Sequence, residues 1–159
     1  MVKKMREILF RGIPKDDTTR HFFADIWKDD CKGSFVYGSL IISKDRYYIC
    51  VSALCQINSC INNGMTSMIE VIPETVGQYT GLCDKNGKKI FEGDILKSVF
   101  RWLDMPKNGV VAFRDGAFGF IWYRGDVEMF HPFTSVCNVT YEVIGNIHDN
   151  PELLKGGAE

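Results

Sequence analysis

The sequence lacks any apolar run approaching the roughly 18 residues that a membrane-spanning helix requires. Residues 1–12 begin with basic side chains, but their apolar core is only Ile8-Leu9-Phe10, and Arg11 follows at once. A secretory signal peptide needs a longer apolar region, of about 7–15 residues. We therefore expect no membrane segment and no leader, with the cytoplasm as the default compartment.

The sequence also lacks an excess of positive charge. It has 19 Lys and Arg against 20 Asp and Glu, with a net charge of −1 and a pI near 6.3. Strong non-specific binding to nucleic acid needs a surplus of cations to displace counterions from the phosphates. Nucleic-acid binding is therefore not supported by the net charge, although a local basic patch would be compatible with it.

Motifs for cofactors and metals are missing as well. There is no Walker A sequence, no G-x-G-x-x-G and no G-x-S-x-G around a nucleophile. Cys50, Cys55 and Cys60 lie five residues apart, a spacing unlike the paired cysteines of zinc sites. We expect no cofactor, no metal and reduced thiols at all six cysteines: Cys31, Cys50, Cys55, Cys60, Cys83 and Cys137.

The abundant residue types indicate β structure. Aromatic residues make up 13% of the chain, with 11 Phe, and they pack well on pleated sheets. In the first half we predict a hairpin over residues 34–51, a strand over residues 67–72 and a short helix from about Thr19 to Lys28. Four or five short strands follow between Glu92 and Ile147, with a hairpin around Arg114-Asp115-Gly116, whereas residues 126–133 are looser and are broken by Pro132. The expected fold is mainly β, or β-rich α+β at most. It has an N-terminal β-hairpin region with a short helix, and an SH3-like small barrel or roll in the C-terminal half.

Residues 72–97 contain the highest density of turn-forming residues in the sequence. Asn86-Gly87 predicts a type I′ turn, in which both central residues have positive φ. Gly93-Asp94 predicts a sharp corner that starts the first long strand, with the Asp94 side chain accepting nearby backbone N–H groups. We expect an N-terminal β region over 1–72 and a barrel domain over 73–159, or one compact unit.

Four blocks of sequence resemble the YopX-like proteins of bacteriophages and prophages. They are MREILFRG, GSLIIS, PETVGQYTGLCDKNGKKIFEGDIL and YEVIGNIHDNPEL, and they occur in the family's order. The resemblance implies an SH3-like barrel in the C-terminal half, a bacterial host cytoplasm and self-association, with no established activity. Two insertions, over 14–33 and 51–67, depart from the family's pattern and leave the N-terminal architecture open.

Two sets of residues are candidates for chemistry. The first combines rings and cations on a small barrel, which could stack bases and hold phosphates, although the core and rim of the barrel is the favoured explanation because a small barrel needs its large apolar residues inside. It comprises Arg101, Arg114, Phe118, Phe120, Trp122 and Arg124. The second is the carboxylate pair Glu92 and Asp94, which could share a proton or hold a metal, but fits a structural turn with Asn86, Gly87 and Gly93 better.

We therefore predict a non-enzymatic phage accessory protein that works by binding and self-assembly, forming a homo-oligomer through exposed strand edges. One alternative is a nucleic-acid-binding or regulatory module that uses the aromatic and arginine face. A further alternative is a small carboxylate-dependent hydrolase.

Overall fold

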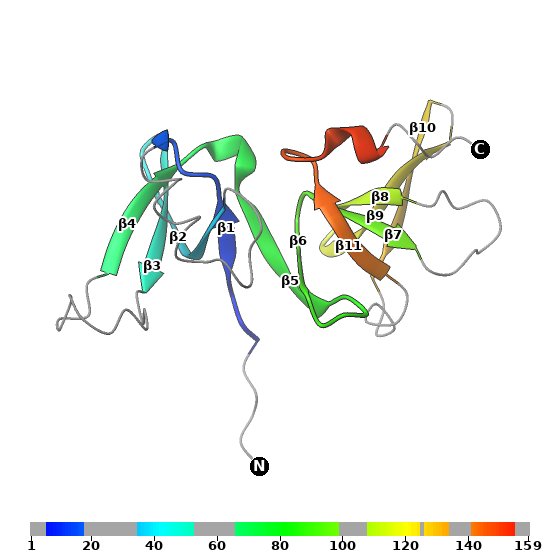
Figure 1. Cartoon of the computed structure of the whole chain (residues 1–159), viewed down its shortest axis with the longest axis horizontal. Coiled ribbons are helices and arrows are strands. Elements are labelled where there is room, and N and C mark those ends of the chain that lie inside the picture. The colour runs from blue at the N-terminus through cyan, green and yellow to red at the C-terminus, as the bar shows by residue number, and fades with distance from the viewer. Residues whose placement is uncertain are drawn as a thin grey trace, which may run out of the picture. The chain divides into compact units, whose positions relative to one another are not determined.

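A computed structural model describes residues 6–17, 35–52, 66–98, 108–124, 126–133 and 141–154 of the 159-residue chain. The chain divides into two compact units. The first is Glu7–Gln78, and the second is Tyr79–Glu159 together with residues 1–6. Each is built mainly from antiparallel strands, which confirms the predicted mainly β fold (Figure 1).

Helical structure is slight in the described ranges. Two short 3-10 helices occur, η1 (Pro73–Thr75) and η2 (Pro151–Leu154). No helix in these ranges has the length and apolar character needed to cross a bilayer. The helix predicted for residues 19–28 lies outside the described residues, as does most of both insertions.

The first unit contains four antiparallel strands in the order β4-β3-β2-β1, and the first residues of β5 pair with β1. Their bounds are β1 (Phe10–Gly12), β2 (Val36–Ser43), β3 (Arg46–Ser52) and β4 (Thr66–Val71). Strands β2 and β3 are joined by a tight turn, with Ser43 opposite Arg46. The predicted hairpin over 34–51 and the strand over 67–72 are therefore confirmed.

The sheet of the first unit curls until residues following β1 reach the end of β4. The N–H of Ile72 donates to the carbonyl of Ile13 at 2.9 Å, and the N–H of Lys15 donates to the carbonyl of Glu70 at 3.0 Å. A further bridge joins Pro14 to β4. The C-terminal end of β4 is thus covered by the chain's own residues 13–15.

Alternating side chains of these strands form the core of the first unit, because successive residues of a strand face opposite sides of the sheet. The buried cluster consists of Val36, Ile49, Val51, Ile69 and Val71. Gly38 on β2 permits a close approach of the backbone of β3. A Cβ at this position would lie 2.1 Å from the carbonyl oxygen of Cys50, so only glycine fits.

The second unit holds a five-stranded antiparallel sheet in the order β10-β9-β8-β7-β11, together with the β5–β6 pair. The strands are β5 (Gly77–Cys83), which begins in the first unit, β6 (Lys89–Phe91), β7 (Asp94–Ser98), β8 (Asn108–Arg114), β9 (Ala117–Arg124), β10 (Val127–Pro132) and β11 (Tyr141–Asn146). The hairpin predicted around Asp115-Gly116 is confirmed by the pairing of β8 with β9.

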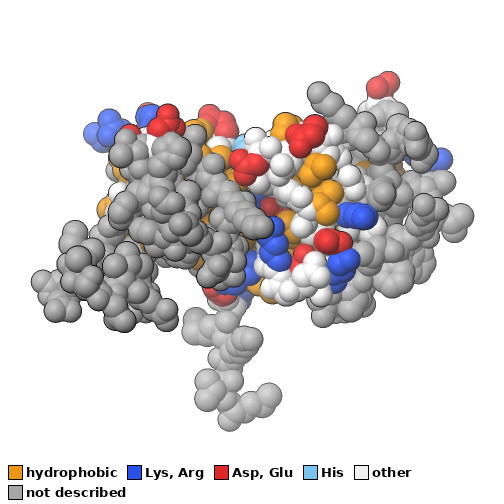
Figure 2. Space-filling view, viewed as in Figure 1, with side chains coloured by type: hydrophobic (Ala, Val, Ile, Leu, Met, Phe, Trp, Pro, Cys, Tyr) orange, Lys and Arg blue, Asp and Glu red, His pale blue; other side chains and the backbone are white. Residues whose placement is uncertain are grey.

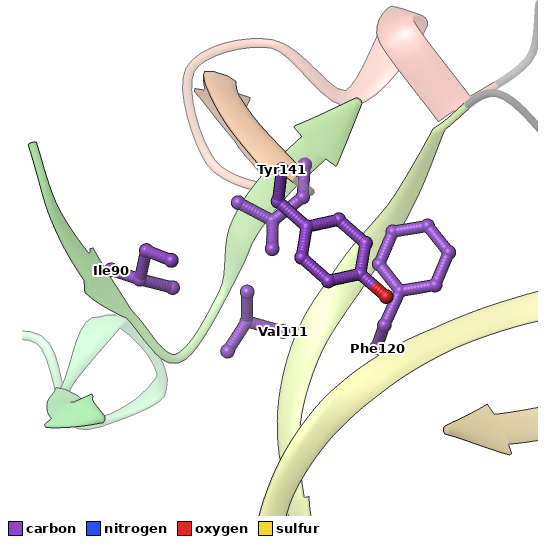
Figure 3. Close-up of a cluster of buried hydrophobic side chains, with 5 residues drawn as sticks. Ile90, Val111, Phe120 and Tyr141 are labelled. Carbon is purple, nitrogen blue, oxygen red and sulfur yellow. The ribbon is translucent and has the colours of Figure 1, made fainter. Parts of the chain in front are cut away.

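Side chains from β6, β7, β8, β9 and β11 meet in the core of this unit (Figure 3). The cluster consists of Ile90, Leu96, Val111, Phe120 and Tyr141. The rings of Phe120 and Tyr141 lie 5.2 Å apart between centroids, in a tilted arrangement. Burial of these side chains removes apolar surface from water and ties β11 to β9, although among the described strands β11 pairs with β7 alone.

The turns at Asp115-Gly116 and at Asn86-Gly87 differ in backbone conformation. At Asp115-Gly116 both residues have positive φ, 51° and 82°, as a type I′ turn requires. At Asn86-Gly87 only the glycine has positive φ, so the type I′ turn predicted there is wrong. The cause is Asp84, whose Oδ1 accepts the N–H of Asn86 at 2.8 Å and that of Lys88 at 2.9 Å. A wider loop therefore forms around the carboxylate.

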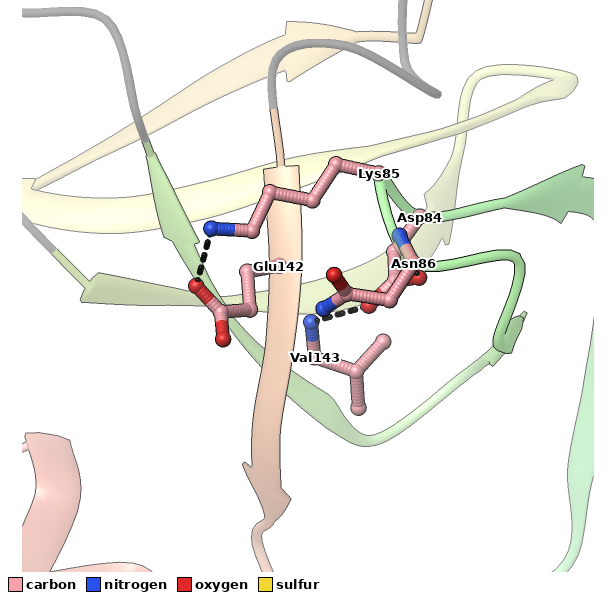
Figure 4. A network of polar contacts seen from close by, with 5 residues as sticks. All are labelled: Asp84, Lys85, Asn86, Glu142 and Val143. Atoms are coloured by element: carbon pink, nitrogen blue, oxygen red, sulfur yellow. Dashed lines mark hydrogen bonds and ion pairs between the residues drawn. The ribbon is translucent and has the colours of Figure 1, made fainter. Parts of the chain in front are cut away.

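The same loop covers the outer side of β11 (Figure 4). Asp84 Oδ2 accepts the N–H of Val143 at 3.0 Å, and the carbonyl of Tyr141 accepts the N–H of Lys85 at 3.0 Å. The Lys85 ammonium also lies 2.6 Å from Glu142 Oε2. These contacts give β11 the partners that a sixth strand would otherwise supply, and Asp84 itself is buried.

Replacing Asp84 with alanine is expected to lower the free energy of unfolding by about 3–5 kcal/mol. Three backbone N–H groups would lose a charged acceptor, and one of them anchors β11. Asp84→Asn keeps one acceptor oxygen and should cost less, about 1–3 kcal/mol. Urea unfolding followed by circular dichroism measures both.

The matched control is Asp115→Asn, an equivalent change in an exposed turn, where asparagine tolerates the positive φ. It should stay within about 0.5 kcal/mol of the unchanged protein. Equal effects of Asp84→Asn and Asp115→Asn would contradict the role given to Asp84.

Candidate functional site

Strand β10 forms one end of the five-stranded sheet. It pairs with β9 along its whole length, from Val127 opposite Arg124 to Pro132 opposite Gly119. Within the described ranges no strand pairs with its other side. All its residues except Phe130 are exposed. Strand β10 is therefore a free edge, in contrast to β11.

Backbone groups along β10 alternate between β9 and the open side. The N–H of Phe133 donates to the carbonyl of Phe118 at 2.9 Å, so the odd-numbered residues face β9. Glu128 and Phe130 accordingly direct their N–H and C=O groups away from the sheet. Pro132 has no N–H to offer, which ends the open edge.

Exposed apolar side chains accompany this edge. Val127 is 60% exposed and Met129 is 38% exposed. Both lie on the same face of the sheet as Trp122 and Phe120, because directly opposed residues share a face and Met129 is opposite Trp122. The apolar face that forms the core thus continues outward to the edge of the sheet.

A polar cluster occupies the opposite face beside β10. The Tyr123 hydroxyl donates to Glu128 Oε2 at 2.9 Å, and Arg114 Nη2 lies 3.0 Å from Glu128 Oε1. The hydrogen bond to the Glu128 carboxylate, which needs the phenolic proton, raises the pKa of Tyr123 above its ordinary value. These contacts orient Glu128 at the edge and compensate its charge.

Sequence reasoning missed this strand. It took residues 126–133 as a loose segment broken by Pro132, and the structure corrects that. Proline is tolerated on an edge strand because the outward N–H has no ladder partner to lose. The signal was present in Val127 and Met129 alternating with Glu128, which is the period of two typical of a strand.

The aromatic and arginine candidates do not form one exposed face. Phe120 is fully buried, Trp122 packs against the core, and Phe118 is half-buried with its ring 5.0 Å from that of Phe113. A ring enclosed like that of Phe120 cannot stack on a base. Arg114 is paired with Glu128, and Arg124 is exposed. Arg101 lies outside the described residues.

The distribution of charge agrees with the balanced composition. On the face seen in Figure 2, basic and acidic side chains of the described residues are interspersed rather than gathered by sign. A phosphate-binding groove needs cations in a continuous row.

Glu92, Gly93 and Asp94 occupy the corner between β6 and β7. Gly93 has a φ of 78°, and Asp94 Oδ2 accepts the N–H of Phe91 at 2.8 Å across the corner. Asp94 is buried, whereas Glu92 is half-buried. The geometry is that of a side chain that holds a turn by bonding to the backbone.

Metal-binding chemistry has no cluster to support it in the described part of the chain. Within those residues, no group of three or more His, Cys, Asp or Glu side chains is placed to hold an ion. Cys50 and Cys83 are free thiols. Cys31, Cys55, Cys60 and Cys137 lie outside the described residues.

Comparison with known proteins identifies the family. The sequence matches the family described as YopX protein over residues 24–155, well over half of the chain. The chain belongs to the YopX family. This confirms the resemblance seen in the four sequence blocks.

Among solved structures, this YopX family member is similar to protein EF1440 from Enterococcus faecalis, known from a crystal structure. The two share 20% identity, with 94% of this chain and 99% of that chain covered and a TM-score of 0.40. No curated protein matches the chain significantly.

Replacing Glu128 with glutamine is expected to lower the pKa of Tyr123 toward that of an ordinary tyrosine. The change removes the negative charge and the charged acceptor that retain the phenolic proton. NMR titration of the protein labelled at the tyrosine ring Cζ measures the shift. Glu142→Gln, which removes a carboxylate paired with Lys85 instead, should leave the Tyr123 titration unchanged.

Proposed function

We propose that this YopX family member is a phage- or prophage-encoded accessory protein that acts by binding and self-assembly rather than by catalysis. Its setting would be the cytoplasm of the bacterial host. Family membership supports the phage setting. The single observation that carries the binding role is the outer edge of β10, with which no strand of the described residues pairs.

A free strand edge presents a row of N–H and C=O groups that another strand can pair with. In the described ranges β11 has the Asp84 loop on its outer side, and the C-terminal end of β4 has residues 13–15. Of these three end strands, β10 alone is open along its whole length in the same ranges. The adjoining Val127 and Met129 add apolar surface that water would leave on association.

The two buried carboxylates of the second unit support a role without catalysis. Asp84 and Asp94 both accept backbone N–H groups and hold loops. Short strands, tight turns and a curled five-stranded sheet further support an SH3-like barrel as the frame that presents the edge.

Light scattering and sedimentation over a range of concentrations test the proposal. We expect a reversible oligomer, whose dissociation constant rises at least tenfold when Val127 and Met129 are both replaced with lysine. Charges on an edge strand oppose pairing by repulsion and by the cost of desolvating them.

The matched control is the double change Ile41→Lys and Ile42→Lys. These side chains are 37% and 57% exposed, close to the values for Met129 and Val127, but they lie on β2, opposite Tyr48 and Tyr47 of β3 and away from β10. The control should assemble like the unchanged protein. A protein that stays monomeric at every concentration would overturn the assembly role.

A further inference from the structure

We propose that the partner at β10 is a second copy of this chain, paired antiparallel about a two-fold axis that passes beside Met129. The inference rests on the proposed function and specifies its partner and register. It makes the interface isologous, so that the same strand contributes on both sides.

The hydrogen-bonding pattern of β10 suits this arrangement. In an antiparallel pair centred on Met129, Glu128 lies opposite Phe130 of the second copy, and the reverse holds by symmetry. Glu128 and Phe130 are the residues whose backbone groups face the open side. Each such pair exchanges two N–H···O bonds, so four bonds would form around the axis. The N–H of Asp126 could also reach the carbonyl of Pro132 of the second copy.

The neighbouring symmetric registers are poorer. A pair centred on Glu128 would place two glutamates directly opposite each other, and like charges in that position are destabilising. A pair centred on Phe130 would set Glu128 opposite Pro132, which has no N–H to donate. Only the register centred on Met129 avoids both defects and uses every outward N–H near the axis.

The side-chain contacts expected in the register centred on Met129 are also favourable. The two Met129 side chains would meet on one face as a non-hydrogen-bonded pair, where opposed strands come closest, and a flexible thioether adapts to such a contact. On the other face Glu128 would lie beside Phe130 of the second copy while keeping its ion pair with Arg114. Its charge would therefore not be left unpaired at the interface.

The interface would be narrow, since it consists of one strand and its flanking side chains. Interfaces below about 1,200 Å² are generally transient. We therefore expect an equilibrium between monomer and dimer that depends on concentration, in which two five-stranded sheets join into one continuous sheet.

Cysteine cross-linking tests the register. Met129→Cys should form a disulfide-linked dimer under mild oxidation, because Cα atoms of an opposed non-hydrogen-bonded pair lie about 4.5 Å apart, within disulfide range. Glu128→Cys should cross-link at least tenfold more slowly, since its two copies would be diagonal neighbours at roughly 7–8 Å. The unchanged protein, with six native cysteines, is oxidised in parallel, and peptide mapping locates the bridge.

Amide hydrogen exchange of the unchanged protein gives an independent readout. The N–H groups of Glu128 and Phe130 should become protected at concentrations where the dimer is populated, whereas those exposed in the Asp115-Gly116 turn should not change. Protection would support pairing at β10 even if a cysteine variant folded poorly.

The outcomes separate the two proposals. Faster cross-linking of Glu128→Cys than of Met129→Cys would overturn the register while leaving assembly through β10 intact. A dimer that forms without protection of Glu128 and Phe130 would overturn the edge as its interface. Absence of any oligomer in light scattering would overturn the proposed function as well.

Discussion

The carboxylate of Asp84 takes the place of a neighbouring strand for β11. One oxygen accepts two N–H groups of its own loop, and the other accepts the N–H of Val143, a residue 59 positions further along the chain. A buried carboxylate is stable only with such donors around it. The loop shape, the closed end of the sheet and the position of β11 all depend on this one group.

Open antiparallel sheets always have two end strands whose outer backbone groups need partners. The first unit gives the C-terminal end of β4 partners by curling until residues 13–15 reach it. The second unit satisfies β11 through the Asp84 loop and leaves β10 open in the described part of the chain. This asymmetry places the proposed binding function on backbone groups at one particular edge.

Core packing also decides what the aromatic residues can do. A small unit has few large apolar side chains, so burying Phe120 and Trp122 contributes more to stability than leaving them for a ligand. Arg114 is directed toward Glu128 rather than toward a phosphate site. The candidate surface therefore moves from the rings of β9 to the neighbouring strand.

The sequence by itself determined the mainly β fold, the hairpins over 34–51 and around Asp115-Gly116, and the family. Strand periodicity and turn residues are signals that lie within a few neighbouring positions, so the sequence alone reveals them. The role of Glu92, Gly93 and Asp94 as a corner was also accessible in this way, because the bond from Phe91 to Asp94 is local.

Only the tertiary structure decided the rest. The strand order made β10 an edge and so allowed Pro132 within a strand, which local rules had counted against it. Asp84 also holds Val143 of a distant strand, in addition to the local bonds by which it displaces the expected type I′ turn at Asn86-Gly87. The strand order and the bond to Val143 depend on contacts between residues far apart in the chain, and no local pattern contains them.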